Sequence, residues 1–312
     1  MNNFKKIGLT ALAGSLAATS AFAAELTATG SAGIKVTNIT GTADASTGKS
    51  WSMPNSIYLT GSGELDNGMT VAVSYEMDQG TSNNSSLGFD NHSVTISSDA
   101  LGKLVFSGHG GSSAQSALDT TAAGDIWNET LGITGIQASA AGNNSLMYTL
   151  PSLVDGLSIS ASMSPGKANQ ETLTAYGATY SGFEGLSLSY GVGDSGAPGS
   201  ILKSTSMKAS YSMGPITVGA SNTEVDGTGN TNDREVTSYQ IAYTVSENLS
   251  LSYGTETFDK ASSTVDEEVE AISASYTSGG ITLSATQYEA KGAGNSATAK
   301  SDKWALGATF AF

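Results

Sequence analysis

The feature that most constrains this chain is an alternation of apolar and small polar residues that recurs from residue 24 to the end. Residues 303–312 show it most clearly, because every second side chain is Trp, Leu, Ala or Phe and those between are Lys, Ala, Gly and Thr. Residues 157–162, 186–192 and 249–255 repeat the pattern with Ser and Gly on the second face. A period of two residues is that of a β-strand, and the helical period of 3.6 is nearly missing. The sequence therefore predicts an all-β protein.

The second face of these strands indicates their surroundings. In a soluble sandwich of two sheets the outward faces carry charge, but here the polar face is mostly Ser, Thr, Gly and Ala. With 38 glycines and 38% hydrophobic residues, the chain also has too little Leu, Ile, Val and Phe for a conventional core of this size. Both features favour an apolar face against lipid and a hydroxyl-lined face against water. A closed barrel is the only kind of β-sheet that is stable in hydrocarbon, since an open sheet edge leaves backbone groups unpaired.

The connections alternate between short and long. Seven tight links carry turn-forming residues, at residues 64–68, 98–102, 151–156, 181–185, 212–215, 246–248 and 278–280. Eight longer polar links alternate with them, at residues 39–53, 79–90, 110–142, 165–170, 194–202, 225–234, 259–265 and 291–300. These links predict a 16-stranded antiparallel transmembrane β-barrel with short periplasmic turns and long extracellular loops. A barrel of this size encloses a water-filled channel rather than a packed core.

The N-terminus indicates where the protein goes. Lys5 and Lys6 precede a short apolar run, and residues 21–23 (Ala-Phe-Ala) form a small-x-small cleavage site. This pattern predicts a signal peptide over residues 1–23, followed by a single barrel domain over residues 24–312. The apolar run is well short of the roughly 20 residues that a transmembrane helix needs. Export and a lipid-facing barrel together predict the bacterial outer membrane as the location.

Three stretches resemble the Gram-negative general porins, which are trimeric, and the alphaproteobacterial members most of all. Residues 143–152 (NNSLMYTLPS), followed by residues 156–160, resemble a stretch of these porins that leads into a strand. Residues 101–108 are similar to the strand before the family's constriction loop, and Phe310 and Phe312 resemble its C-terminal assembly signal. The resemblance implies a homotrimer that contacts outer-membrane lipid, lipopolysaccharide and the barrel-assembly machinery.

The resemblance also implies that the third loop folds into the lumen, with acidic residues opposite basic residues of the wall. The third long link, residues 110–142, is by far the longest, and such a loop is usually functional. Its acids Asp119, Asp125 and Glu129 correspond to the acidic side of the constriction. Family members carry several wall arginines, whereas this chain has one arginine, at the end of a strand, and His109 at the family's arginine position. The alternation of the strands, called strand phase below, also places four residues on the polar, lumen-facing side, and we predict that they line the pore wall: Lys35, Glu76, Lys103 and Lys208.

The balance of charge excludes one class of partner and favours one function. With 28 acidic residues against 13 Lys plus Arg, the formal net charge is −15. Nucleic acid is excluded as a partner, because phosphate binding needs a basic face. An acidic pore attracts entering cations. The sequence therefore predicts a porin for passive diffusion of small hydrophilic solutes and ions, with a preference for cations.

No pattern in the chain is typical of catalysis or of a metal site. Cysteine is absent, and the two histidines lack zinc-ligand spacing. Residues 191–196 (GVGDSG) match G-x-G-x-x-G, but no helix pattern follows them. We therefore expect neither an enzyme nor a cofactor, and loosely bound Ca²⁺ at the acidic mouth stays open. Two alternatives also stay open: a secreted β-rich surface protein, such as an adhesin or surface-layer subunit, and a substrate-specific channel with Phe258 and Tyr288 as its inward aromatics.

Overall fold

The computed structural model describes residues 25–41, 47–78, 88–115, 120–136, 139, 142–166, 171–197, 200–227 and 233–312. The predicted signal peptide, residues 1–23, lies outside the described residues. The strands are β1 (Glu25–Gly41), β2 (Gly48–Ser52), β3 (Asn55–Glu64), β4 (Thr70–Asp78), β5 (Gly88–Ser98), β6 (Gly102–His109), β7 (Ser145–Thr149), β8 (Leu157–Ser164), β9 (Leu173–Tyr180), β10 (Leu186–Ala197), β11 (Ser200–Met213), β12 (Ile216–Asp226), β13 (Arg234–Thr244), β14 (Leu249–Lys260), β15 (Glu267–Ser278), β16 (Ile281–Lys291) and β17 (Lys300–Ala311). Two short 3-10 turns, η1 (Ile126–Asn128) and η3 (Ala293–Asn295), lie in loops.

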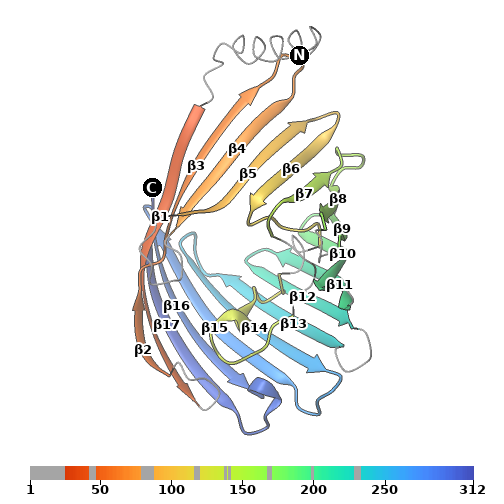
Figure 1. The fold of residues 1–312 in the computed structure, drawn as a ribbon. Coiled ribbons are helices and arrows are strands. Elements are labelled where there is room, and N and C mark those ends of the chain that lie inside the picture. The colour runs from red at the N-terminus through yellow and green to blue at the C-terminus, as the bar shows by residue number, and fades with distance from the viewer. Residues whose placement is uncertain are drawn as a thin grey trace.

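The strands close into an antiparallel ring (Figure 1). The last strand, β17, pairs with β1 along Ser31–Gly41 and so completes the barrel. Strands β2 and β3 are two parts of one strand, because both pair with β1 in a continuous register. The interruption contains Pro54, which has no N–H to donate but accepts from the Gly33 N–H at 2.8 Å. The 17 labelled strands therefore make a closed 16-stranded barrel, which confirms the predicted fold class.

The short turns lie where the sequence predicts them. Seven links of two to seven residues join β3 to β4, β5 to β6, β7 to β8, β9 to β10, β11 to β12, β13 to β14 and β15 to β16. The predicted long loop over residues 194–202 is wrong, because β10 ends at Ala197 and β11 begins at Ser200. Strand pairing uses backbone hydrogen bonds, so these strands continue where the apolar alternation has already stopped.

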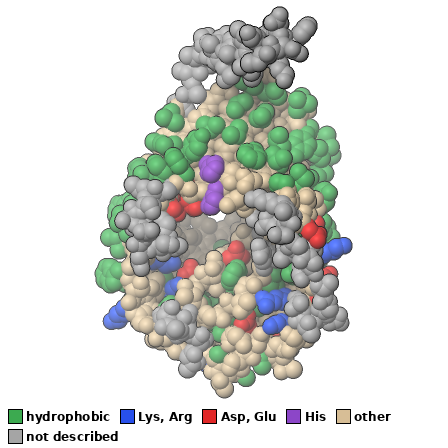
Figure 2. All heavy atoms as spheres, in the orientation of Figure 1, with side chains coloured by type: hydrophobic (Ala, Val, Ile, Leu, Met, Phe, Trp, Pro, Cys, Tyr) green, Lys and Arg blue, Asp and Glu red, His purple; other side chains and the backbone are tan. Residues whose placement is uncertain are grey.

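Large apolar side chains occupy alternate strand positions and face outward. Ile272, Leu306 and Phe310 are exposed, whereas Lys303 and Ala305 on the opposite face of β17 are buried. Figure 2 shows hydrophobic side chains spread over the outer face of the strands above a hollow in the molecule. An exposed apolar surface on a closed barrel is suited to lipid. Within the described ranges, no helix is long and apolar enough to span a bilayer.

The barrel interior also holds an apolar cluster, which the alternation of the strands did not predict. Leu131, from the segment between β6 and β7, is 0% exposed and lies at its centre. Inward-facing wall residues surround it: Val236, Phe258, Val269, Ala271, Tyr288, Ala290 and Ala305. One side of the lumen is therefore packed like an ordinary protein core.

Candidate functional site in the barrel lumen

The segment between β6 and β7, residues 110–144 and called loop 3 below, crosses the inner face of the ring (Figure 1). Three of its backbone N–H groups donate to serine hydroxyls on the wall: Ala114 to Ser162 on β8 (2.8 Å), Ala122 to Ser221 on β12 (2.8 Å) and Ala123 to Ser238 on β13 (2.9 Å). A serine is short enough to let the loop backbone approach and still offers an acceptor. Part of the hydroxyl face that was predicted to be wet therefore binds loop 3.

Gln115 holds the first part of loop 3 against β10 and β11. Its amide nitrogen donates to Ser206 Oγ (3.0 Å), and its amide oxygen accepts from Ser204 Oγ (2.6 Å). Glycines on β10 make room for this contact, since a Cβ at Gly193 would lie 2.8 Å from Gln115 Oε1. Gly191 faces the same side chain. The first two glycines of the G-x-G-x-x-G match thus allow loop 3 to pack closely against the wall.

Two buried carboxylates hold the middle of loop 3, and neither was among the residues predicted to line the pore. Glu256 on β14 is 0% exposed and accepts hydrogen bonds from three loop groups: Thr121 Oγ1, Ile126 N (3.2 Å) and Trp127 N (2.9 Å). Glu267 on β15 accepts from Thr134 N (3.0 Å) and from Gly294 N (2.7 Å) in the loop after β16. A buried carboxylate is stable only where such donors satisfy it. The signal that the sequence offered for both residues is an acid at an inward-facing strand position.

Apolar contacts also hold loop 3 against the barrel wall. The wall residues that contact loop 3 are together called its seat below. The Trp127 ring meets Phe258 edge-on, with centroids 6.2 Å apart and planes at 74°, a favourable aromatic geometry. Leu131 fills the centre of the cluster beside them. Phe258 and Tyr288, the two inward aromatics of the substrate-specific alternative, are buried in this cluster and do not form an exposed track.

Glu129 of loop 3 pairs with lysines on two strands. Its Oε2 lies 2.6 Å from Lys303 Nζ on β17 and 3.3 Å from Lys35 Nζ on β1. Burial raises the pKa of the Glu129 carboxyl, but the hydrogen bond from Lys303 and the charge of Lys35 outweigh it and hold this pKa below its ordinary value. The alternation places Lys303 on the polar face but does not distinguish it from the other residues there. Its partner lies 174 residues away, and strand phase gives no information about such a contact.

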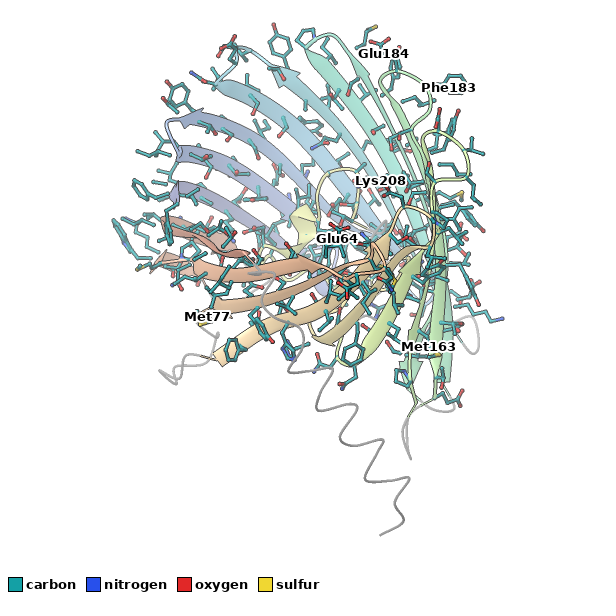
Figure 3. The ribbon with its side chains drawn as sticks, turned by 90° about the horizontal axis from the view of Figure 1, so that it is seen from above. Glu64, Met77, Met163, Phe183, Glu184 and Lys208 are labelled. Carbon is teal, nitrogen blue, oxygen red and sulfur yellow. The ribbon has the colours of Figure 1, made fainter. Side chains whose placement is uncertain are left out.

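The other predicted loop acids and Lys208 have different surroundings. Asp125 closes a turn within loop 3, where its Oδ1 accepts from Thr121 N (2.9 Å) and its own N–H donates to Thr121 Oγ1 (2.7 Å). Asp119 lies outside the described residues. Lys208 on β11 faces the lumen (Figure 3), and its Nζ donates to the Thr120 carbonyl oxygen of loop 3 (2.8 Å). Of the three predicted acids, Glu129 is the one that the described structure brings to wall lysines.

Glu76 and Lys103 lie on the inner wall away from this seat. Glu76 on β4 is buried and accepts from Tyr58 Oη and Asn91 Nδ2, both at 2.5 Å. Lys103 lies at the start of β6, near the short turns, where it lines a cavity of about 800 Å³ together with Glu64. Both residues therefore have the inward orientation that strand phase predicts.

His109 differs from its predicted position on the pore wall. The register of β5 and β6 shifts by one residue at Gly108, so that His109 pairs with His92. The two imidazole rings stack with centroids 6.4 Å apart, and His92 stacks in turn on the exposed Tyr75. A bulge of one residue exchanges the two faces of a strand. His109 consequently shares the face of Tyr75, which the unbroken alternation did not predict.

The wall opposite the seat of loop 3 is lined by hydroxyl groups. A cavity along β1 and β3–β5 is bordered by six of them, from Thr27, Thr60, Ser62, Ser74, Ser93 and Thr95. The described hydrogen bonds and ion pairs between loop 3 and the wall lie on β8, β11–β15 and β17, and at Lys35 of β1, with none on β3–β5 among the described residues. The lumen is therefore divided into a side packed beneath loop 3 and a polar side.

A family model described as Gram-negative porin matches residues 8–269, which is most of the chain. This chain belongs to the Gram-negative porin family. Membership agrees with the predicted family and favours an outer-membrane channel over a secreted surface protein. The porin family and the transmembrane barrel place this porin in the bacterial outer membrane, as predicted. No curated protein matches this porin.

Solved structures of other proteins share the fold of this porin at low sequence identity. The anion-selective porin from Comamonas acidovorans matches with a TM-score of 0.71 and 15% identity, over 93% of this chain and 100% of that one. OmpT of Vibrio cholerae in its trimer form matches with a TM-score of 0.73 and 12% identity, over 93% and 100%. A mutant of the Rh. blastica porin matches with a TM-score of 0.68 and 14% identity, over 92% and 100%. At these identities the likeness concerns the fold.

Proposed function

We propose that this porin forms a water-filled channel for passive diffusion of small hydrophilic solutes and ions. The divided lumen carries this proposal. Loop 3 occupies one side and is held by serine hydroxyls, buried carboxylates and an apolar cluster. The hydroxyl-lined side along β3–β5 offers water and solutes a polar path.

The mechanism is selection by size and charge, without a chemical step. A water-filled path removes the barrier that hydrocarbon presents to a hydrated solute, and the width and charge of the path sort what passes. Loop 3 sets the width in this proposal. Its many contacts with the wall favour one fixed position, so that the width stays constant during conduction.

A preference for cations is the finer part of the proposal. Its support is the net charge of −15 together with Glu64 and Glu76 on the inner wall. Entering cations concentrate in such a field, and salt screens it over about 8 Å at physiological ionic strength. The pore roles of Asp119 and Asp125 belong to this proposal as well.

Planar-bilayer recording of the detergent-purified protein tests this function. We expect ohmic single-channel conductance and, in a KCl gradient, a reversal potential of the sign that cation preference gives. Heat-unfolded protein is the matched control and should not conduct. Lack of conductance, or a protein that is soluble and monomeric without detergent, contradicts the channel. A reversal potential of the opposite sign contradicts only the cation preference.

We also propose that this porin assembles as a homotrimer in contact with outer-membrane lipid and lipopolysaccharide. OmpT, which shares the fold, has a trimer form. We assign Phe312 and Phe310 to recognition by the barrel-assembly machinery, since the C-terminal residue lies at the closing seam. There the Phe312 N–H donates to the Gly30 carbonyl (3.0 Å), and the Gly30 N–H donates to the Phe312 carbonyl (2.9 Å).

A further inference from the structure

Glu129 lies where the first and last strands of the barrel meet. The seam between β1 and β17 is a ladder that runs from Ser31 opposite Ala311 to Gly41 opposite Ser301. From inside the barrel, each of these two strands presents one lysine to the same oxygen of Glu129. A single loop carboxylate thus bridges the two strands whose pairing closes the barrel.

The ammonium group of Lys303 depends on this carboxylate. The Lys303 side chain is 6% exposed, and its Nζ donates both to Glu129 Oε2 (2.6 Å) and to the Glu129 carbonyl oxygen (2.7 Å). The Tyr288 ring lies 5.8 Å from the same Nζ, close enough for a cation–π contact. A buried ammonium that loses its carboxylate is strongly destabilising. Lys303 therefore favours the docked position of loop 3.

Glu129, Lys35 and Lys303 together do not form an acidic lining of the pore. Two ammonium groups and one carboxylate leave one net positive charge on these three side chains. The Lys35 side chain is 37% exposed and the Glu129 side chain 24%, so the group is in contact with water. A passing cation meets a carboxylate whose charge two lysines already neutralise.

We propose that Glu129 clamps loop 3 to the closing seam and sets ion selectivity by masking Lys35 and Lys303. This inference rests on the proposed channel function and assigns a different role to an acid predicted to attract cations. Loss of Glu129 leaves two unmasked ammonium groups and removes the one of the loop's anchors that lies at the seam. Loss of Lys303 changes the charge in the opposite direction and removes the same anchor.

Four variants separate the charge from the anchor. E129Q raises the net charge of the group by one, K303M lowers it by one, and the double variant E129Q/K303M returns it to the wild-type value. K303R keeps the charge and offers N–H donors to Glu129 from a larger side chain. K203M is the matched control, because Lys203 lies on β11 on the opposite strand face from the lumen residue Lys208. Bilayer reversal potential reports charge, and open-channel current noise reports the mobility of loop 3.

Acrylamide quenching of Trp127, in a background with Trp51 and Trp304 changed to Phe, gives a second measure of loop 3. It needs no conducting channel and uses the one remaining tryptophan of three.

We expect E129Q to lower the ratio of cation to anion permeability about fivefold, from the interaction of unit charges at about 4 Å in water. K303M should raise the ratio, and the double variant should return it close to wild type. Noise and Trp127 quenching should increase in E129Q, K303M and the double variant, increase less in K303R, and stay at the wild-type level in K203M.

Two results overturn the clamp. One is wild-type noise and quenching in both E129Q and K303M, and the other is a K303M permeability ratio that moves in the same direction as E129Q. If the wild-type protein forms no channel, the proposed function fails, while Trp127 quenching still decides whether Glu129 and Lys303 hold the loop.

Discussion

Changing Glu256 to Gln tests whether buried carboxylates hold loop 3 in place. The carboxylate is 0% exposed and accepts hydrogen bonds from Thr121 Oγ1, Ile126 N and Trp127 N. A glutamine keeps one acceptor oxygen but turns an NH₂ group toward the remaining donors. Hydrogen bonds to charged groups contribute about 1.5–3 kcal/mol each, so we expect a loss of about 3 kcal/mol. That loss raises the ratio of released to docked loop roughly a hundredfold.

Single-channel recording is the assay for this variant. A loop that leaves its seat spends part of the time in the conducting path, so we expect E256Q to show larger current noise and a spread of conductance levels. E268Q is the matched control, because Glu268 is exposed on the neighbouring strand β15 and the substitution changes the net charge equally. Wild-type noise and a single conductance in E256Q, with the protein folded as a barrel, refute the argument that Glu256 anchors loop 3.

Two further predictions concern pH and barrel closure. The pKa of Glu129 is lowered in the folded protein, so its contribution is present above the ordinary carboxyl pKa of about 4.3 and is lost as the pH falls through the lowered value. The difference in Trp127 quenching between wild type and E129Q should therefore persist from about pH 7 to pH 5 and vanish only at lower pH. Gly30→Ala should weaken closure by about 1–3 kcal/mol, because a Cβ there would lie 2.7 Å from the Ser56 backbone oxygen and 2.8 Å from the Phe312 ring. The weaker closure is measured as a lower temperature at which the folded band changes to the unfolded band on SDS gels. Gly63→Ala is the control, because a Cβ there has no atom within 4 Å, and it should leave that temperature unchanged.

Much of the barrel follows from the sequence, because its cause is local. A residue on a strand shares its face with the second residue along, so the alternation assigns the outward position of Leu306 and the inward position of Lys35 without knowledge of the rest of the chain. Turn-forming residues likewise mark the end of each strand locally, which is why the short turns and the number of strands were predictable. Where a single extra residue enters, as at Gly108, the same rule assigns His109 to the wrong face.

The seat of loop 3 could not be derived in this way. Whether an inward Ser or Glu meets water or a loop depends on the path of a segment that is distant in sequence. Ser238 and Glu256 are separated from their loop partners by more than 100 residues. Strand phase predicts that both point inward and does not distinguish them from the hydroxyls along β3–β5.

The sequence by itself determined a lipid-facing barrel of sixteen strands and the face of most residues, since a period of two is a property of neighbouring residues. Only the tertiary structure decided which inward residues bind loop 3, that an apolar cluster fills one side of the lumen, and that Glu129 meets Lys35 and Lys303. The two lysines meet at Glu129 only because ring closure brings β1 beside β17, and the alternation within a single strand does not predict which distant strand will lie beside it.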